Sequence, residues 1–173
     1  MKKLIAHRGN IEGPSNNDNH PQHIAGAIAL GYDVEVDIWF IDNKFFFGHD
    51  CPQYEISIDF INQYIDNILY HCKNLSCFIE LLDRRAHCFW HDKDDYALTN
   101  ENYIIVYPTK DIPTSFQSIY MLLPEYIMCY DGKNIEDVMH RNLHGFQTNF
   151  PHSHICSDYV KILSEINLEG IKE

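Results

Sequence analysis

Three features are missing from this sequence: long apolar runs, an excess of positive charge, and closely spaced cysteine pairs. Because no apolar stretch reaches about 18 residues, we expect no membrane-spanning helix. The apolar run Leu4–Ala6 is too short for the core of a secretory signal peptide. These absences predict a cytoplasmic protein without stable membrane insertion.

The shortage of positive charge excludes one class of partner. Thirteen basic residues stand against 25 acidic ones, which gives a net charge of −12. Such a chain repels nucleic-acid backbones and anionic membranes, so we expect no nucleic-acid partner. A small anionic substrate can still bind through a local metal ion or arginine.

The cysteines do not suggest a zinc site or a disulfide framework. Six are present, but none forms a C-x-x-C pair, which argues against a cysteine-only zinc site. Cys72, Cys88 and Cys156 lie within apolar, strand-like runs, where reduced buried thiols are common. We therefore expect free thiols.

Segments with strand character alternate with segments of helical spacing. Strands are expected over residues 3–6, 33–40, 44–47, 67–72, 86–90, 103–107, 125–130 and 155–158, and helices over 21–30, 58–65, 75–84, 134–142 and 159–166. Such alternation predicts an α/β fold with a mostly parallel sheet. A length of 173 residues is typical of one domain, taken here as residues 1–173.

Polar motifs follow several of these strands. His7-Arg8-Gly9 closes the first strand, and Gly48-His49-Asp50 follows a hairpin. In the segment 33–40, Val34, Val36 and Ile38 alternate with Glu35 and Asp37, so both carboxylates face the same side of one strand. Barrel-type α/β enzymes carry their chemistry at this end of the strands.

These motifs resemble those of the glycerophosphodiester phosphodiesterases and the wider superfamily of phospholipase-C-like phosphodiesterases, which includes spider-venom sphingomyelinase D. The resemblance is strong over residues 4–50: HRG, a loop, a helix, G-x-D-x-E-x-D over 31–37, a hairpin, then His49-Asp50. It continues more weakly in His71-x-Lys73 and in the strand 155–158. Three differences stand out: His71 replaces an acidic residue, Asp18-Asn19 stands for the acidic–Asn pair of the first loop, and the chain is shorter than is usual.

The resemblance implies a TIM-like (β/α)8 barrel, here compact with reduced helices. It implies that Glu35 and Asp37 bind a metal, that His7 and His49 form the acid–base pair, and that Arg8 and Lys73 contact phosphate. The first-loop pair would place Asn19 at the site.

The residue chemistry is consistent with these roles, although each residue also has a structural explanation. Carboxylates bind hard cations such as Mg²⁺ or Ca²⁺, or they lie on a solvated strand face. As a third ligand, His71 would favour Mn²⁺ or Zn²⁺ over Ca²⁺; its structural explanation is a histidine of the barrel core. His7 and His49 suit proton transfer near neutral pH, and either could be the acid or the base. Lys73 contacts phosphate or forms a buried ion pair.

Three further residues could line the site. Trp39 ends a strand and could bind an apolar or choline-like group, although packing is the simpler explanation. His91 follows a strand within the charged run 91–95, which could line the mouth or form a solvated loop. Asp158 ends the last strand and could orient a site group.

The sequence therefore predicts metal-dependent hydrolysis of a small phosphodiester, with Mg²⁺ as the expected ion. Two alternatives remain open. One is a barrel that keeps the phosphate pocket but binds its ligand without turnover, which the replacement by His71 suggests. The other is a sphingomyelinase-D-like lyase that forms a cyclic phosphate. The oligomeric state is not predicted.

Overall fold

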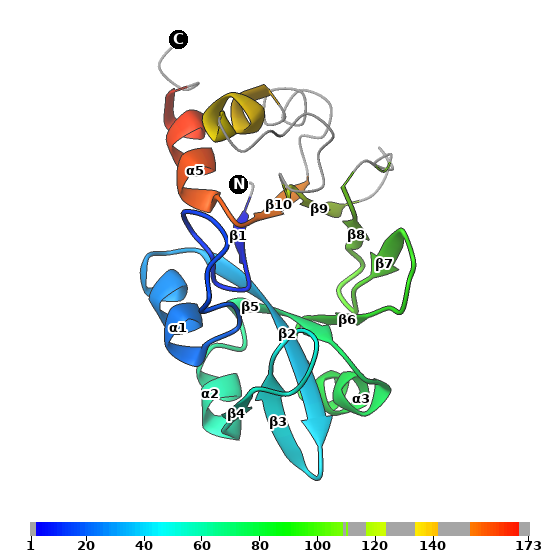
Figure 1. Cartoon of the computed structure of the whole chain (residues 1–173). Coiled ribbons are helices and arrows are strands. Elements are labelled where there is room, and N and C mark those ends of the chain that lie inside the picture. The colour runs from blue at the N-terminus through cyan, green and yellow to red at the C-terminus, as the bar shows by residue number, and fades with distance from the viewer. Residues whose placement is uncertain (1–2, 109, 111–116, 124–133, 142–152, 170–173) are drawn as a thin grey trace.

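The computed structural model describes residues 3–108, 110, 117–123, 134–141 and 153–169. The chain forms a mixed α/β fold around a ten-stranded curled sheet (Figure 1). The strands are β1 (Leu4–His7), β2 (Asp33–Ile41), β3 (Lys44–Phe47), β4 (Tyr54–Ile56), β5 (Ile68–Cys72), β6 (Cys88–Trp90), β7 (Tyr96–Leu98), β8 (Ile104–Val106), β9 (Ser118–Met121) and β10 (His154–Ser157). The helices are α1 (Pro21–Ala29), α2 (Ile58–Gln63), α3 (Leu75–Asp83), α5 (Val160–Glu169) and one over residues 135–141.

The α/β prediction with a mostly parallel sheet is confirmed, and seven of the eight expected strands are present with small shifts of their ends. The eighth, expected over 125–130, lies outside the described residues. Three strands were not expected from the sequence: β4, β7 and β9. Each has only three or four residues, too few for a clear alternation of apolar and polar side chains.

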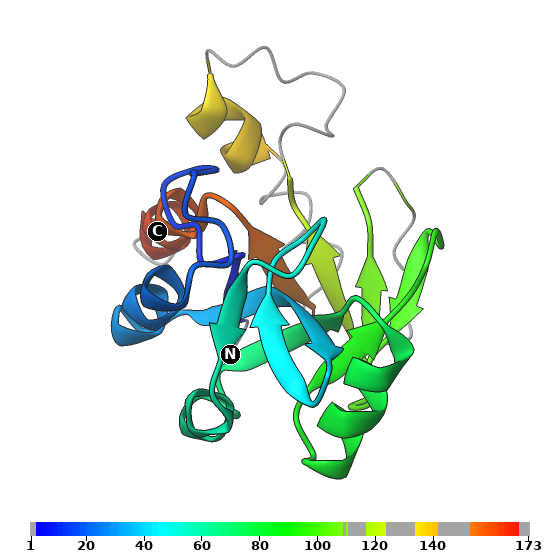
Figure 2. The ribbon, with the colours of Figure 1, turned by 60° about the horizontal axis from the view of Figure 1, so that its bottom comes forward.

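Parallel strands form the curled part of the sheet. Strand β1 pairs with both β2 and β10, β2 pairs with β5, and β5 pairs with β6. On the other side β10, β9 and β8 follow in parallel order. Helices α1, α2, α3 and α5 lie outside the curl (Figures 1 and 2). The carboxyl ends of these parallel strands consequently face the same end of the molecule.

The segment from β6 to β8 departs from the strand–helix alternation. Only residues 91–95 separate β6 from β7, whereas a parallel crossover needs about a dozen residues. The chain therefore returns antiparallel to β6, and a single antiparallel bridge joins Phe89 of β6 to Thr99. Strand β7 also pairs antiparallel with β8. A short returning strand thus takes the place of the crossover helices here.

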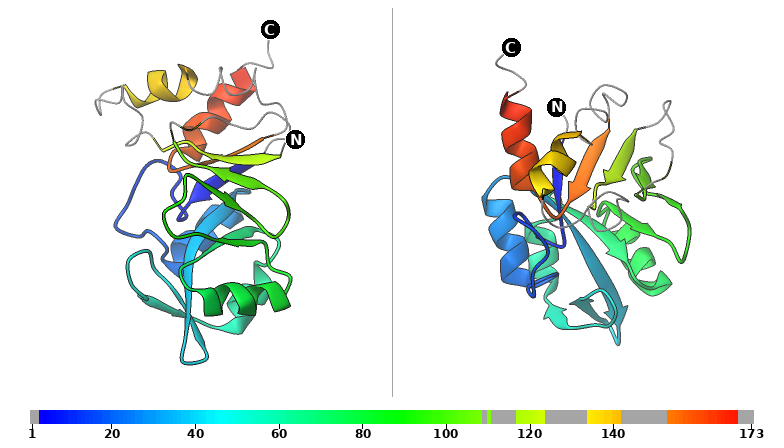
Figure 3. Two further views of the ribbon diagram at one scale, coloured as in Figure 1. Left: turned by 90° about the vertical axis from the view of Figure 1, so that its right-hand side faces the viewer. Right: turned by 45° about the horizontal axis from the view of Figure 1, so that its top comes forward.

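Local sequence signals define the element ends. Ser57 and Asn74 cap α2 and α3 by accepting hydrogen bonds from the backbone N–H groups of Phe60 and Cys77. Asp42 and Asn43 both have positive φ, as a tight hairpin turn requires. The resulting β2–β3 hairpin extends away from the rest of the sheet (Figure 3).

The two faces of the sheet form separate cores. The outer cluster, which contains Val34, Val36 and Ile38, packs against α1, α2 and α3. The inner cluster, which contains Ile5, Leu69 and further buried side chains, fills the inside of the curl. The predicted alternation along β2 is confirmed, because Glu35 and Asp37 are buried on the face opposite to the valines.

Candidate active site

A cavity of about 610 Å³ opens where the parallel strands end. Its lining comprises His7, Arg8, Glu35, His49, His71, Lys73, Phe89, His91, Asp92, Tyr107, Pro108, Met121 and Leu123. Every residue predicted for catalysis or phosphate binding lines this cavity, together with two of the three predicted metal ligands. The third, Asp37, is buried directly behind them.

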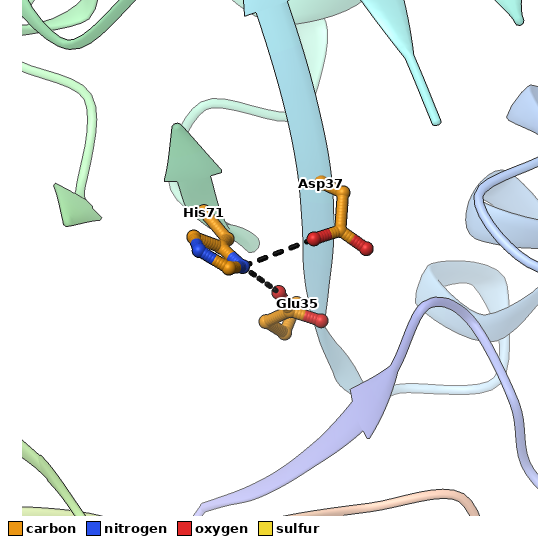
Figure 4. Close-up of side chains that lie close together, drawn as sticks. All are labelled: Glu35, Asp37 and His71. Atoms are coloured by element: carbon orange, nitrogen blue, oxygen red, sulfur yellow. Dashed lines mark ion pairs between the residues drawn. The ribbon is translucent and has the colours of Figure 1, made fainter. Parts of the chain in front are cut away.

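Glu35, Asp37 and His71 converge from two adjacent strands (Figure 4). Asp37 and His71 are register partners in the β2–β5 pair, so their side chains lie side by side on one face. The Nδ1 atom of His71 lies 3.0 Å from Asp37 Oδ1 and 3.8 Å from Glu35 Oε1. One oxygen or nitrogen from each of the three residues falls within 4.8 Å of the others.

The two carboxylates differ sharply in their electrostatics. Burial, together with the negative charge of Asp37, raises the pKa of Glu35 to about 7. Burial would also raise the pKa of Asp37, but His71, Arg8 and Lys73 outweigh it and hold this pKa well below its ordinary value. Asp37 is therefore the permanent anion of the cluster, and Glu35 titrates near neutrality.

His71 is neutral at physiological pH. Burial lowers the pKa of His71 to about 4, although Asp37 opposes the shift. Its ring lies parallel to the rings of Phe89 and His91, with centroids 4.6 and 4.8 Å away. Because a metal ligand must present a neutral imidazole nitrogen, this environment suits His71 for coordination.

The donor set fits a divalent cation. Glu35 Oε2 and Asp37 Oδ1 are buried and lack a well-aligned hydrogen-bond donor among the described residues. A buried carboxylate oxygen without a donor is costly, and a cation would compensate this cost at Glu35 Oε2; Asp37 Oδ1 already lies 3.0 Å from His71 Nδ1 and 3.3 Å from Lys73 Nζ. Two carboxylates and one imidazole are compatible with Mg²⁺ or Mn²⁺, and the imidazole nitrogen makes the site compatible with Zn²⁺ as well.

His7 is held by Asp158. Its Nδ1–H donates to Asp158 Oδ1 at 2.9 Å, and its Nε2 lies 3.8 Å from Glu35 Oε2. Burial would lower the pKa of His7, but Asp158 and Glu35 together raise it above its ordinary value. Asp158 does not line the cavity; it fixes the ring that does.

Asn10 connects this pair to the first loop. Its Nδ2 group donates to Asp158 at 2.8 Å and to Asp18 at 2.9 Å, and its Oδ1 lies 3.1 Å from His23 Nε2. The side chain is fully buried. Asn10 therefore separates two carboxylates that would otherwise repel each other.

Replacing Asn10 with alanine should lower the free energy of unfolding by about 2–3 kcal/mol, because the Asp158 carboxylate loses a buried donor. Urea unfolding monitored by circular dichroism measures the change. Asn16→Ala, at an exposed position of the same loop, serves as the control. Equal stability of the two variants would contradict the bridging role of Asn10.

Arg8 owes its position to a tight turn. Arg8 and Gly9 both have positive φ, and a Cβ atom on Gly9 would lie 2.9 Å from the His23 ring, so glycine is required there. The turn directs Arg8 Nε to 3.0 Å from Asp37 Oδ2. From the neighbouring strand, Lys73 Nζ lies 3.3 Å from Asp37 Oδ1. Arg8 and Lys73 thus each form an ion pair with Asp37 and also line the cavity.

His49 and Trp39 belong to the hairpin side of the site. The His49 side chain is 42% exposed, lines the cavity, and contacts Asp50 Oδ1 through Nδ1 at 2.8 Å. Trp39 is not among the lining residues; its indole N–H donates to the Gly48 carbonyl. Trp39 therefore anchors the turn that carries His49.

Asn19 and His91 are both close to the cluster, in different ways. Asn19 is buried, donates to Asp37 Oδ2 at 3.0 Å, and accepts from the Asp37 backbone N–H. His91 lines the cavity, stacks on His71, and is hydrogen-bonded to the Tyr107 hydroxyl. Asn19 thus fixes Asp37, and His91 forms part of the wall beside His71.

Sequence reasoning missed Asn10, Tyr107 and the apolar lining. Asn10 directly follows the HRG motif, which is a usable signal. Tyr107 ends the expected strand 103–107, and Met121 ends β9, which was not expected. Both strands are too short for alternation to indicate which side chains face the cavity. The predicted catalytic and phosphate-binding residues nonetheless lie together around one cavity at the strand ends, as their positions after the strands implied.

Comparison with known proteins gave no match to any protein-family profile and no significant match among curated proteins. Within the described ranges, no helix combines the length and apolarity that crossing a membrane requires.

Proposed function

We propose that this chain is a metal-dependent phosphodiester hydrolase that uses His7 and His49 as its acid–base pair. The observation that carries the proposal is the convergence, on one cavity, of a carboxylate–histidine cluster, two cations and two further histidines. A structural ion-pair network would not require a buried oxygen without a partner, and Glu35 Oε2 has no hydrogen-bond partner among the described residues.

The proposal includes a compact barrel of the (β/α)8 type. The curled parallel strands and the bridge between Phe89 and Thr99 support closure of the sheet. In such barrels, chemistry sits at the carboxyl ends of the strands, where this cavity lies. Between β6 and β8, where every residue is described, no helix is present, which agrees with the predicted barrel in which some helices are reduced.

Each residue has a definable task in this scheme. Glu35, Asp37 and His71 would hold the cation, which when bound offsets charge on the phosphoryl oxygens. Arg8 and Lys73 present positive charge at the same wall and orient the phosphate. Asp158 keeps the His7 proton on Nδ1, so Nε2 is the atom that exchanges a proton with the substrate or water.

A non-catalytic binding role is the second candidate. Asp37 already has three cationic or polar neighbours, Arg8, His71 and Lys73, within 3.3 Å, so part of its charge is compensated without an ion. Such a site could hold a phosphate ester without turning it over. The assay for turnover separates the two candidates.

Hydrolysis of bis(4-nitrophenyl) phosphate tests the proposal. We expect the protein to release nitrophenolate when Mg²⁺ or Mn²⁺ is present. The release should stop when EDTA is added and return when the metal is restored. Phosphorus NMR of the product would distinguish hydrolysis from formation of a cyclic phosphate on a substrate with a neighbouring hydroxyl. Full metal occupancy without turnover on a panel of diesters would sink the enzyme proposal and favour the binding role.

A further inference from the structure

The cavity has two chemically different walls. One wall, formed by the ends of β1, β2 and β5, carries the charged and ionisable side chains of the proposed site. The other wall follows β6, β8 and β9 and consists of Phe89, Pro108, Met121 and Leu123, with the Tyr107 ring. In Figure 1, β8 and β9 lie on the opposite side of the curl from β2 and β5.

The apolar wall is deep inside the molecule. Phe89, Met121 and Leu123 are only 2%, 5% and 5% exposed, yet all three line the cavity. They belong to the inner cluster of the curled sheet, which holds them in place. Water against such a surface is unfavourable, so an apolar ligand group that displaces it gains affinity.

This wall offers little to a polyol. Of the described polar side chains next to it, Tyr107 and His91 are hydrogen-bonded to each other through His91 Nε2, so His91 Nδ1 is the one atom of this pair left without a partner among the described residues. Asp92 is exposed and would repel an anionic ligand. Hydroxyl groups placed against Phe89, Met121 and Leu123 would therefore lose hydrogen bonds to water without gaining partners.

We propose, on the basis of the phosphodiester site inferred above, that the substrate is a phosphodiester with one apolar ester group. The phosphate lies by Arg8, Lys73 and the metal cluster, and the apolar chain or ring lies on the wall of Phe89, Met121 and Leu123. A diester of two small polyols would leave that wall in contact with water or with hydroxyl groups. The cavity volume of about 610 Å³ accommodates both parts.

Isothermal titration calorimetry in Mg²⁺ buffer tests the apolar ester group directly and needs no turnover. The probes are inorganic phosphate and five phosphate monoesters: methyl, ethyl, propyl, butyl and glycerol phosphate. Affinity should rise about fourfold for each methylene from methyl to butyl phosphate, equivalent to ~0.8 kcal/mol per group. Propyl phosphate should bind at least about tenfold more tightly than glycerol phosphate, which has the same number of carbon atoms.

Leu123→Asn should flatten this series, whereas Leu98→Asn, at a 62% exposed position, should leave it unchanged. Thermal unfolding of both variants checks that they fold; if Leu123→Asn does not, the wild-type series decides alone. Equal affinity for all the alkyl phosphates, or tighter binding of glycerol phosphate than of propyl phosphate, would contradict the proposal of an apolar ester group. The proposed phosphate site would not be affected by that result. Absence of binding by every probe, inorganic phosphate included, overturns both.

Discussion

Asparagine in place of Asp37 is expected to lower the free energy of unfolding of the metal-free protein by about 3–5 kcal/mol at pH 7. The Asp37 carboxylate is 1% exposed and lies within 3.3 Å of Arg8, His71 and Lys73. Its removal takes the paired carboxylate away from Lys73 and leaves Arg8 with only the more distant Asp18, and both cations are partly buried. The side-chain oxygen of an asparagine could still accept the hydrogen bond from Asn19. Its NH₂ group, a donor, would then face His71 Nδ1 and the Lys73 ammonium group.

The matched change Glu35→Gln should have the opposite effect. Glu35 is equally buried, but its nearest charged partners, His7 and His71, lie 3.8 Å away, and burial beside Asp37 raises its pKa to about 7. Neutralising it removes this strain, so the metal-free variant should be more stable than the wild type by about 2 kcal/mol above pH 7. Both variants should lose metal binding.

The two effects depend on pH in opposite directions. The pKa of Asp37 is lowered by folding, so its stabilisation is present above about pH 4 and is lost as the pH falls further. The pKa of Glu35 is raised, so wild-type stability declines as the pH rises from about 4.5 through 7. The advantage of Glu35→Gln should therefore vanish near pH 4, where both proteins carry a neutral group.

Urea unfolding in EDTA at pH 4, 5.5 and 7.5 measures all three proteins under the same conditions. Equal destabilisation by both substitutions would mean that both carboxylates serve the fold as ion-pair partners. The division of roles between Glu35 and Asp37 would then be wrong. Titration of the metal into the wild type should recover stability, because an ion that binds only the folded state shifts the unfolding equilibrium.

The sequence was informative where one strand carries a strict alternation. Along β2, apolar side chains at even positions and carboxylates at 35 and 37 specified both the strand and the side on which the acids lie. The polar motif His7-Arg8-Gly9 at the end of the first expected strand was also visible in the sequence, whereas the clash that a side chain at Gly9 would make with His23 was not. Such signals are local, so they survive without any knowledge of the remaining fold.

Other parts of the site depend on contacts between distant segments. Asp158 meets His7 because β1 and β10 are paired in register, 151 residues apart in sequence. Asn10 joins that pair through a loop whose conformation has no simple sequence pattern. The apolar wall comes from short strands with three or four residues, where alternation is too brief to indicate which side chains face inward.

Alanine at His7 should reduce phosphodiester turnover by about 10²–10⁴-fold while metal affinity stays close to wild type. His7 is not among the cluster of metal-binding atoms, but its Nε2 faces the same cavity. A matching loss is expected for His49→Ala, whose ring reaches the cavity from the hairpin side. Calorimetric titration with Mg²⁺ checks that each variant retains the cluster.

The leaving group separates the roles of the two histidines. A 4-nitrophenolate departs without being protonated, whereas an alkoxide needs a proton from a general acid. Against the effect of burial, the hydrogen bond to Asp158 raises the pKa of His7, which favours the acid role for His7. His7→Ala should therefore lose far more activity on a dialkyl phosphate than on bis(4-nitrophenyl) phosphate, and His49→Ala should lose activity on both.

The reverse pattern would assign the base to His7 and the acid to His49, and would leave the acid–base pair intact. Asp158→Asn provides a matched variant, since it alters the group that holds the His7 proton on Nδ1 and that also accepts from Asn10. It should shift the pH–rate profile of the alkyl ester and affect the nitrophenyl ester little. Near wild-type turnover in both His7→Ala and His49→Ala would contradict histidine catalysis in this cavity altogether.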